Sequence, residues 1–262
     1  MALYDRAAAA YDLIMRGSHD KDYDREADEV AGIIRASAPG ARSVLDVACG
    51  NAGHLARLAK KFATAEGVEL SPSMIAEANR CHPGVTVHRG DMRTFRVDRR
   101  FDAVTCLFSS IGYMTTVADL RAAVANMAAH LAPAGVLIIE GWFGPGDWEP
   151  GTFGAESAAD DDLAVARAVR STVEGRLSKM EMHYLLATAD EIRHVTEVHR
   201  LGLFTPAQYR RAMSIAGLDV HEQSGLTGRG LYVGVAPASE RRRRAAVRSS
   251  VPGRVSPRPA IG

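Results

Sequence analysis

Three residues around one short segment have the types and spacing to bind a nucleoside. Asp46 lies in the apolar run at 44–48 (VLDVA), and small residues including Gly50 follow directly. Small residues let a ligand approach the backbone, and the N-terminus of a following helix presents free N–H groups. Glu69, 19 residues after Gly50, ends a second apolar run. A carboxylate there suits a ribose diol, because it accepts hydrogen bonds from two hydroxyls. The pattern predicts a nucleoside-binding unit of strand, turn, helix and strand.

The elements that must position these residues alternate along the chain. Residues 1–38 have helical spacing that ends at Pro39-Gly40, and apolar runs then alternate with helical segments as far as residue 140. Ser71-Pro72 and Thr205-Pro206 each predict a capped helix start. Residues 219–223 and 231–236 predict a closing hairpin at the sheet edge. The alternation predicts an α/β fold with a mostly parallel, seven-stranded sheet and helices on both faces.

The alternation of strands and helices stops between about residues 155 and 204. Met180, Met182 and Tyr184 alternate with polar residues, and similar patches follow to residue 204. This period of two predicts a small antiparallel sheet, with turns at 174–175 and 189–190. We expect His183 and His199 to lie on its solvated face.

Charge, cysteine content and hydropathy exclude several protein classes. The chain has 262 residues and a formal net charge of +1, but residues 238–262 hold seven Arg and one Glu. The rest is therefore net acidic, which argues against nucleic acid as a partner. The basic tail is expected to be disordered. Three cysteines without framework spacing predict reduced thiols in the cytoplasm. No signal peptide, membrane span or metal-ligand spacing is predicted.

Longer motifs identify a family. The segments DVACG, VELSPSM, RGDMRTF, FDAVTCLFSSIGYM, EGRLSKMEMHYL and GRGLYVG occur in order between residues 11 and 236. Together they resemble the class I S-adenosylmethionine-dependent methyltransferases. More narrowly, they resemble the N,N-dimethyltransferases that act on dTDP-linked amino-deoxyhexoses in antibiotic pathways. A dinucleotide fingerprint would have glycines at Ala48 and Ala52, so NAD fits poorly. Ala52 also departs from the usual methyltransferase pattern, and Tyr113 stands where relatives usually carry a histidine.

The resemblance implies a fold, a domain plan and partners. The fold is a Rossmann-like, doubly wound α/β sheet with an inserted antiparallel layer. The domains implied are an N-terminal helical lid at 1–38, a cofactor-binding core at 39–154 and 205–237, the inserted layer at 155–204 and the tail at 238–262. The implied cofactor is S-adenosyl-L-methionine, the substrate is a dTDP-amino-deoxyhexose, and the assembly is a homodimer.

The resemblance also implies site residues. In the cofactor pocket Glu69 meets the ribose, Tyr11 and Lys21 lie near the methionine moiety, and Tyr11 faces the sulfonium. The full predicted cofactor set is Tyr11, Lys21, Asp46, Ala48, Gly50, Glu69, Asp91, Met92, Phe108 and Ser109. The predicted substrate set is Tyr4, Trp142, Phe143 and Arg229, and the predicted catalytic residues are Tyr113 and Glu140. Arg229 suits a diphosphate, because a guanidinium binds phosphate oxygens through two hydrogen bonds.

The expected reaction is in-line attack of a neutral amine on an activated methyl group, so the enzyme mainly supplies alignment and a dry site. A phenol is a poor base at neutral pH, so Tyr113 is expected to orient the amine. Three alternatives stay open from the sequence. In the first, the cofactor is the same but the acceptor is another small amine or a hydroxyl. In the second, the chain modifies nucleic acid through its tail. In the third, it binds a nucleotide without catalysis. The same residues also have purely structural interpretations. Asp46 and Glu69 would then be turn acids, Tyr113 a core residue and Arg229 part of a surface salt bridge.

Overall fold

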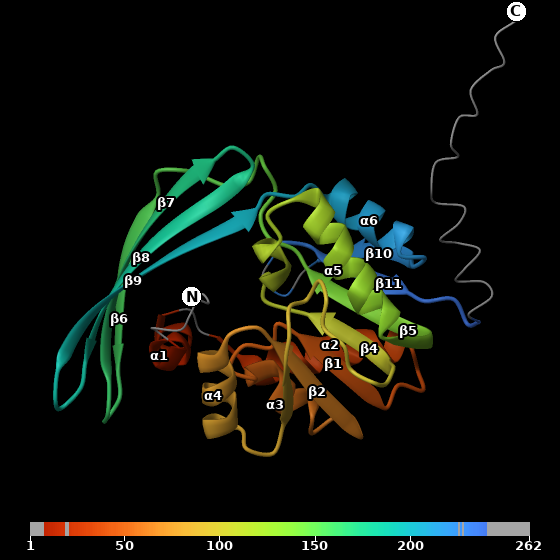
Figure 1. Ribbon diagram of the computed structural model, residues 1–262, viewed down its shortest axis with the longest axis horizontal. Coiled ribbons are helices and arrows are strands. Elements are labelled where there is room, and N and C mark those ends of the chain that lie inside the picture. Colours follow the sequence, from red (N-terminus) through yellow and green to blue (C-terminus); the bar gives the residue numbers. More distant parts are fainter. Residues whose placement is uncertain (1–7, 19–20, 225, 227, 240–262) are drawn as a thin grey trace, which may run out of the picture.

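A seven-stranded sheet forms the centre of the computed structural model, which describes residues 8–18, 21–224, 226 and 228–239 (Figure 1). Its strand order is β10-β11-β5-β4-β1-β2-β3. The strands are β1 (Ser43–Val47), β2 (Thr64–Glu69), β3 (Thr86–Arg89), β4 (Phe101–Cys106), β5 (Leu131–Glu140), β10 (Asp219–Gln223) and β11 (Leu231–Val235). All neighbours pair in parallel except β11 with β5 and β10 with β11. The predicted fold class and its closing hairpin are confirmed.

Helices cover both faces of this sheet because neighbouring strand residues point to opposite sides. On one face Val44 packs with α2 (Tyr23–Ser37) and α3 (Gly53–Leu58). On the other, Leu45 belongs to the core formed with α5 (Val117–Ala129) and α6 (Pro206–Ile215). α4 (Pro72–Cys81) packs against β2 and β3.

The predicted helix starts are confirmed at two positions. Ser71 accepts a hydrogen bond from the Met74 N–H at the start of α4, with Pro72 at the first helical position. Thr205 begins α6 with a complete capping box to Gln208. These caps satisfy backbone donors that a helix start otherwise leaves without partners.

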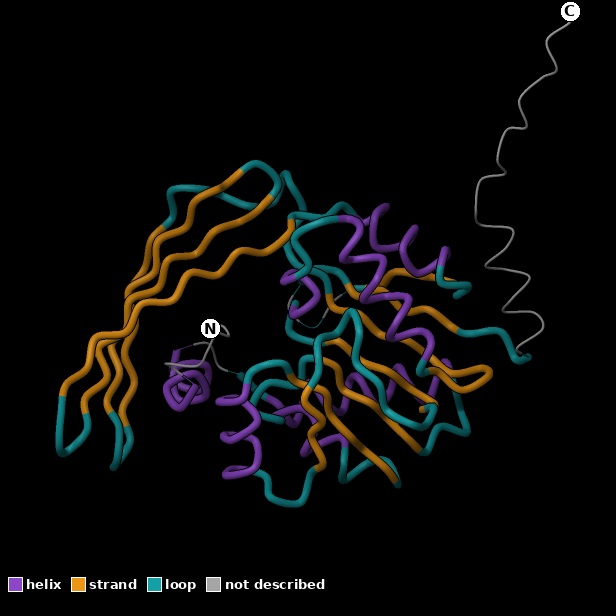
Figure 2. The backbone as a smooth tube through the Cα atoms, in the orientation of Figure 1, coloured by secondary structure: helices purple, strands orange, loops and turns teal. Residues whose placement is uncertain are grey.

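A second sheet of four antiparallel strands forms a separate layer (Figure 2). It consists of β6 (Phe153–Ala159), β7 (Ala164–Glu174), β8 (Leu177–Ala187) and β9 (Ile192–Gly202). Its strands join through the turns predicted after Glu174 and near residues 189–190, and β6 begins two residues before the predicted boundary. We call this sheet the roof, because it faces the carboxyl-terminal ends of the main strands.

Helix α1 (Ala8–Ser18) lies between the roof and the main domain (Figure 1). Ile14 and Met15 pack with Tyr184 and Val195 of the roof in a hydrophobic cluster separate from the clusters of the main domain. The roof therefore has a core of its own.

The turns after β1 and β4 have backbone conformations that usually require glycine. Ala48 has φ 59°, Gly50 has φ 56° and Ala52 has φ 64°, and Phe108 and Ser109 have φ 51° and 61°. A left-handed conformation costs roughly 1–2 kcal/mol at a residue with a Cβ. Such residues persist where the surroundings fix them, and they gather at functional sites.

No helix in the described part of the chain is long and apolar enough to cross a membrane. Tyr4 and most of the predicted basic tail lie outside the described residues.

Candidate active site

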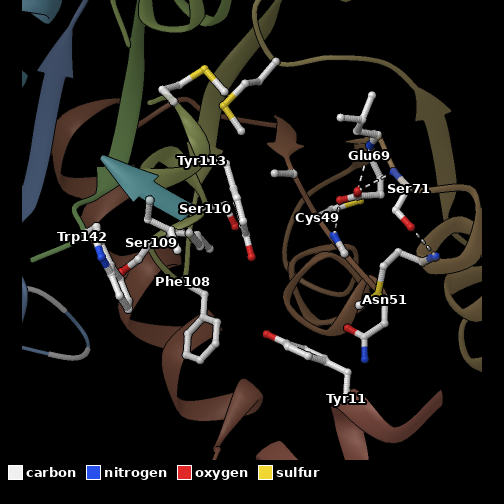
Figure 3. A pocket seen from close by; sticks show the side chains of 18 of the residues that line it. Tyr11, Cys49, Asn51, Glu69, Ser71, Phe108, Ser109, Ser110, Tyr113 and Trp142 are labelled. Carbon is white, nitrogen blue, oxygen red and sulfur yellow. Dashed lines mark hydrogen bonds between the residues drawn. The ribbon is translucent and has the colours of Figure 1, made fainter. Parts of the chain in front are cut away.

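A cavity of about 660 Å³ lies between the carboxyl-terminal ends of the main strands and the roof. Its size is within the range of ligand pockets, and the ends of parallel strands are where α/β folds bind ligands. Figure 3 shows Phe108, Ser109, Tyr113 and Trp142 on one side of it and Glu69 on the other.

Glu69 is held rigidly at the end of β2. Its Oε2 accepts a hydrogen bond from the Gly50 N–H at 2.9 Å. Its Oε1 accepts from the backbone N–H groups of Leu70 and Ser71, each at 2.8 Å. The side chain is 9% exposed and lines the cavity, so its carboxylate is fixed in place before a ligand arrives.

Asp46, at the end of β1, is the most deeply buried carboxylate that lines the cavity, at 2% exposure. The Thr105 hydroxyl donates to its Oδ1 at 2.7 Å. Burial raises the pKa of Asp46 to about 6, and the hydrogen bond from Thr105 opposes that shift. A positively charged ligand group beside Asp46 would replace part of the lost solvation.

Asp91 and Met92 line the cavity beyond β3. The Arg93 guanidinium donates to Asp91 Oδ2 at 2.6 Å, and this hydrogen bond lowers the pKa of the Asp91 carboxyl. Asp91 therefore stays ionised as an acceptor at this edge, while Met92 contributes apolar surface.

The turn after β4 is tied to the end of β5. The Phe108 N–H donates to Glu140 Oε2 at 2.7 Å, and the Ser109 hydroxyl donates to the Gly141 carbonyl at 2.6 Å. These bonds hold two left-handed residues at the cavity wall. Glu140 itself is fully buried and is not among the lining residues, so the structure places it behind the wall.

Lys21 also lies behind the cavity wall. Its Nζ is 3.7 Å from the Phe108 ring centroid and donates to Glu26 Oε2 at 2.5 Å. Burial lowers the pKa of the Lys21 ammonium, and the Glu26 hydrogen bond opposes the shift. Tyr11, from α1, directs its hydroxyl into the cavity (Figure 3).

Arg229 lies among aromatic rings on the side of the cavity that carries Trp142. Its Cζ is 5.0 Å from the Trp142 ring, 5.4 Å from Phe143 and 5.8 Å from Phe108. Burial lowers the pKa of the guanidinium, and the charge of Glu140 opposes that shift. Stacked and partly desolvated, this guanidinium is placed to bind an anionic group.

Tyr113 joins the main domain to the roof. It lies in the short helix η1 (Ser110–Tyr113), and its Oη is 2.7 Å from His199 Nδ1 on β9. His199 Nε2 is in turn 3.2 Å from Glu197 Oε2. The expectation that His199 lies on a solvated face is wrong: its side chain is 1% exposed, because the inner face of β9 is covered by the main domain. His183 is exposed, as expected.

Most predicted site residues meet in this one cavity. Those that line it are Tyr11, Asp46, Ala48, Gly50, Glu69, Asp91, Met92, Phe108, Ser109, Tyr113, Trp142 and Arg229. Lys21, Glu140 and Phe143 lie outside the lining set, and Tyr4 is outside the described residues. Their predicted contacts with ligands stay predictions.

Several residues that line the cavity were not predicted from the sequence. Met180, Met182, Tyr184 and Arg167 reach the cavity from the inner face of the roof. The alternation of the two methionines with polar residues is the signal that would have found this face. In the part of the chain that the structure describes, no cluster of His, Cys, Asp or Glu has the arrangement of a metal site.

Comparisons with known proteins show which family the chain belongs to. Residues 44–135 match a methyltransferase domain family. The chain is 46% identical over 230 residues to dTDP-3-amino-3,6-dideoxy-alpha-D-glucopyranose N,N-dimethyltransferase from Streptomyces fradiae, covering 87% of this chain and 90% of that protein. The fold matches the crystal structure of Streptomyces venezuelae DesVI with a TM-score of 0.82, at 42% identity over 88% of this chain and 98% of the other.

A ligand-bound structure is similar as well. It is the amino pentose methyltransferase CalS10 from Micromonospora echinaspora, with S-adenosylmethionine bound. The TM-score is 0.76 and the identity 43%, over 90% of this chain and 98% of the other. The resemblance stated from the sequence motifs is confirmed.

Proposed function

The chain belongs to the family of S-adenosylmethionine-dependent sugar N,N-dimethyltransferases, and we propose that it methylates the amino group of a dTDP-linked amino-deoxysugar, twice in succession. The single observation that carries this proposal is the cavity, which is lined by the carboxylates of Asp46, Glu69 and Asp91 and also by Arg229, an arginine set among aromatic rings. The side with the carboxylates suits a cationic nucleoside, and the side with Arg229 suits an anionic nucleotide sugar. An antibiotic pathway is the setting that the resemblance implies.

The residues present fit S-adenosylmethionine. Glu69 is proposed to bind the ribose hydroxyls, because its carboxylate is already aimed at the turn that would flank them. Asp46, Ala48 and Gly50 would face the charged methionine part, with Tyr11 on its other side. Asp91 would accept from the adenine amine, and Met92 would pack on the ring. When bound, this cofactor supplies a methyl group already activated by its sulfonium.

The acceptor is proposed to lie under the roof. Arg229 would hold the diphosphate through paired hydrogen bonds, and the ring of Trp142 would form an apolar wall for the deoxysugar. Phe108 and Ser109 form the floor between the two ligands. Tyr113 would orient the amine through its oxygen.

Lys21, Glu140 and Phe143 support this site from behind in the proposed arrangement. Glu140 fixes the turn that carries Phe108, and Lys21 packs on the ring of the same residue. Phe143 stacks edge-on against Trp142, with their ring centroids 4.8 Å apart. We therefore propose supporting rather than ligand-contacting roles for these three residues.

We also propose a homodimer that works in the cytoplasm. Cys49, Cys81 and Cys106 are free thiols, which suits a reducing compartment. Phe153, Leu185 and Ile192 are large apolar side chains exposed on the roof, and such side chains suit a protein contact. Sedimentation velocity over a concentration series tests the dimer, and a monomer at every concentration would overturn it.

The activity is tested by mass spectrometry. Purified protein is incubated with S-adenosylmethionine and a panel of dTDP-hexoses that carry the amine on different ring carbons. We expect successive gains of one and two methyl masses on at least one member. Cofactor binding without methylation of any member would move the acceptor to another small amine or a hydroxyl. No cofactor binding would refute the proposal entirely.

A further inference from the structure

The contact between Tyr113 and the roof continues into a chain of buried hydrogen bonds. Tyr113 Oη, His199 Nδ1, His199 Nε2 and Glu197 Oε2 lie in sequence, with spacings of 2.7 and 3.2 Å between residues. The side chains of His199 and Glu197 are 1% and 5% exposed. Tyr113 opens this chain to the cavity, because it is among the lining residues.

The chemistry of Glu197 sets the direction of these hydrogen bonds. An ionised carboxylate only accepts hydrogen bonds, so the His199 nitrogen beside it carries the proton when the ring is neutral. Nδ1 then holds a lone pair and accepts the Tyr113 hydroxyl hydrogen. The Tyr113 oxygen therefore offers acceptor lone pairs, which suit the N–H of an ammonium in the cavity.

We propose, on the basis of the proposed N-methyltransferase function, that His199 and Glu197 form a proton relay through Tyr113 that takes the proton from the acceptor ammonium. The ammonium N–H passes its proton to Tyr113 Oη while the phenol proton moves to His199 Nδ1. The amine becomes neutral and keeps its electron pair for the methyl group. The imidazole becomes an imidazolium, hydrogen-bonded to Glu197, and returns its proton through Tyr113 to water in the cavity after the product leaves.

The relay resolves the difficulty of using a phenol as a base. Tyr113 never has to exist as a phenolate, because it gains one proton as it gives up another. Glu197 stabilises the imidazolium that forms, as an orienting carboxylate does for a histidine base elsewhere. Glu197 Oε1 is buried without a hydrogen-bond partner among the described residues, so a cation formed on His199 would offset part of the cost of burying this side chain.

Other ionisable groups surround the relay and bear on its pH dependence. Along the inner face of the roof lie Tyr184 on β8, Arg167 on β7 and Glu156 on β6, and Arg167 is paired with Glu156. Glu174 forms ion pairs with Lys179 and with Arg200, which lie next to Met180 and His199 along their strands, and Arg200 is itself among the residues that line the cavity. From the main domain, Tyr113 on η1 faces His199. The kcat of each relay variant must therefore be compared with the wild-type kcat at the same pH, because these groups also affect the shape of the pH–rate profile.

The first test needs no substrate. Nitrogen-15 NMR of the histidine rings in the ligand-free protein reports which nitrogen carries the proton, with His199→Gln assigning the signal. We expect the neutral His199 ring to carry its proton on Nε2, beside Glu197. A fixed Nδ1–H tautomer at His199 would overturn the relay whatever the acceptor proves to be.

The second test is kinetic. At pH 7, His199→Gln is expected to lower kcat by about 100-fold, in line with the loss of a general base, with little change in KM for the acceptor. At about pH 9.5 more of the amine is already neutral in solution, so the gap from wild type should close to about threefold. A gap that stays constant with pH would show that His199 is only structural.

Controls separate the relay from folding and from the proposed function. His183→Gln, on the exposed face of the same sheet, should match wild type at every pH. Glu197→Gln should lower kcat less than His199→Gln, and Tyr113→Phe should add little to His199→Gln, because residues in one chain are not additive. Strictly multiplicative effects of Tyr113→Phe and His199→Gln would refute the relay. If wild type methylates no amino sugar, the proposed function fails, while the NMR result still stands.

Discussion

Asp46 offers a test in which stability and binding move in opposite directions. Burial raises its pKa from 3.8 to about 6. Between these values the folded protein holds a proton that the unfolded chain has lost, so stability falls as pH rises through this window. Above it the ionised carboxylate costs about 3 kcal/mol, from about 2.2 pKa units at 1.36 kcal/mol each.

We expect Asp46→Asn to remove this cost. Its buried amide N–H₂ group offsets about 1–2 kcal/mol of the gain, because it replaces an atom that only accepts. The variant should therefore be more stable than wild type by roughly 1–2 kcal/mol at pH 7.5. The destabilising charge is about half as costly at pH 5, so the advantage should shrink there by about 1.4 kcal/mol.

Urea unfolding of both proteins at pH 5 and pH 7.5, without cofactor, measures the difference. Calorimetric titration with S-adenosylmethionine measures the other half of the prediction. Asp46→Asn should bind the cofactor at least about 10-fold more weakly at pH 7.5, because a charge-assisted contact is lost. Wild-type affinity should itself fall below about pH 6, as Asp46 takes up its proton. A stability difference that does not change with pH would refute the reasoning.

Three further substitutions test the site and its turns. Arg229→Lys is expected to raise KM for the nucleotide sugar about 10-fold with kcat little changed, since a lysine lacks the paired donors; steady-state kinetics would contradict this if only kcat fell. Gly67→Ala would place a Cβ 2.6 Å from Cys49 Sγ, so chemical denaturation should show a loss of about 1–3 kcal/mol, and an unchanged midpoint would refute the clash. Ala48→Gly relieves a left-handed residue at φ 59° and should raise Tm by about 2–4 °C, whereas a lower Tm would mean that its methyl packing outweighs the strain.

The main sheet and the meeting of Asp46 and Glu69 at one cavity were predictable because their signals are local. Each strand carries its own apolar run, and a parallel sheet brings the carboxyl ends of those runs to one edge. Asp46 and Glu69 therefore meet the same cavity without any knowledge of long-range contacts. The left-handed conformation at Ala48 could also be expected from the sequence, because a dinucleotide-binding fingerprint has its first glycine at this position.

The roof was predictable as an antiparallel sheet, but the sequence did not show that the main domain covers the face of β9 that carries His199. On β8 the apolar residues mark the covered face, but on β9 the covered face carries the polar side chains of Glu197 and His199, which are 5% and 1% exposed. His199 pairs across strands with Met180, so it shares the face that lines the cavity. Its partner Tyr113 is 86 residues away in the chain, and no local pattern connects them. Glu140 shows a related limit of sequence patterns, because a strand-end acid can point behind the cavity wall or into the cavity, and the sequence does not distinguish the two.

The separate core of the roof has a consequence for how the molecule unfolds. Ile14, Tyr184 and Val195 hold the roof and α1 together without the main sheet, and the cavity lies between the two packed bodies. Regions with their own cores open as separate cooperative units. In the ligand-free protein, amide hydrogens of β7 and β8 should therefore exchange through openings that leave β1 and β4 protected. A ligand that contacts both bodies stabilises them together. Saturation with such a ligand should therefore merge the opening of the roof and the opening of the main domain into one global unfolding transition.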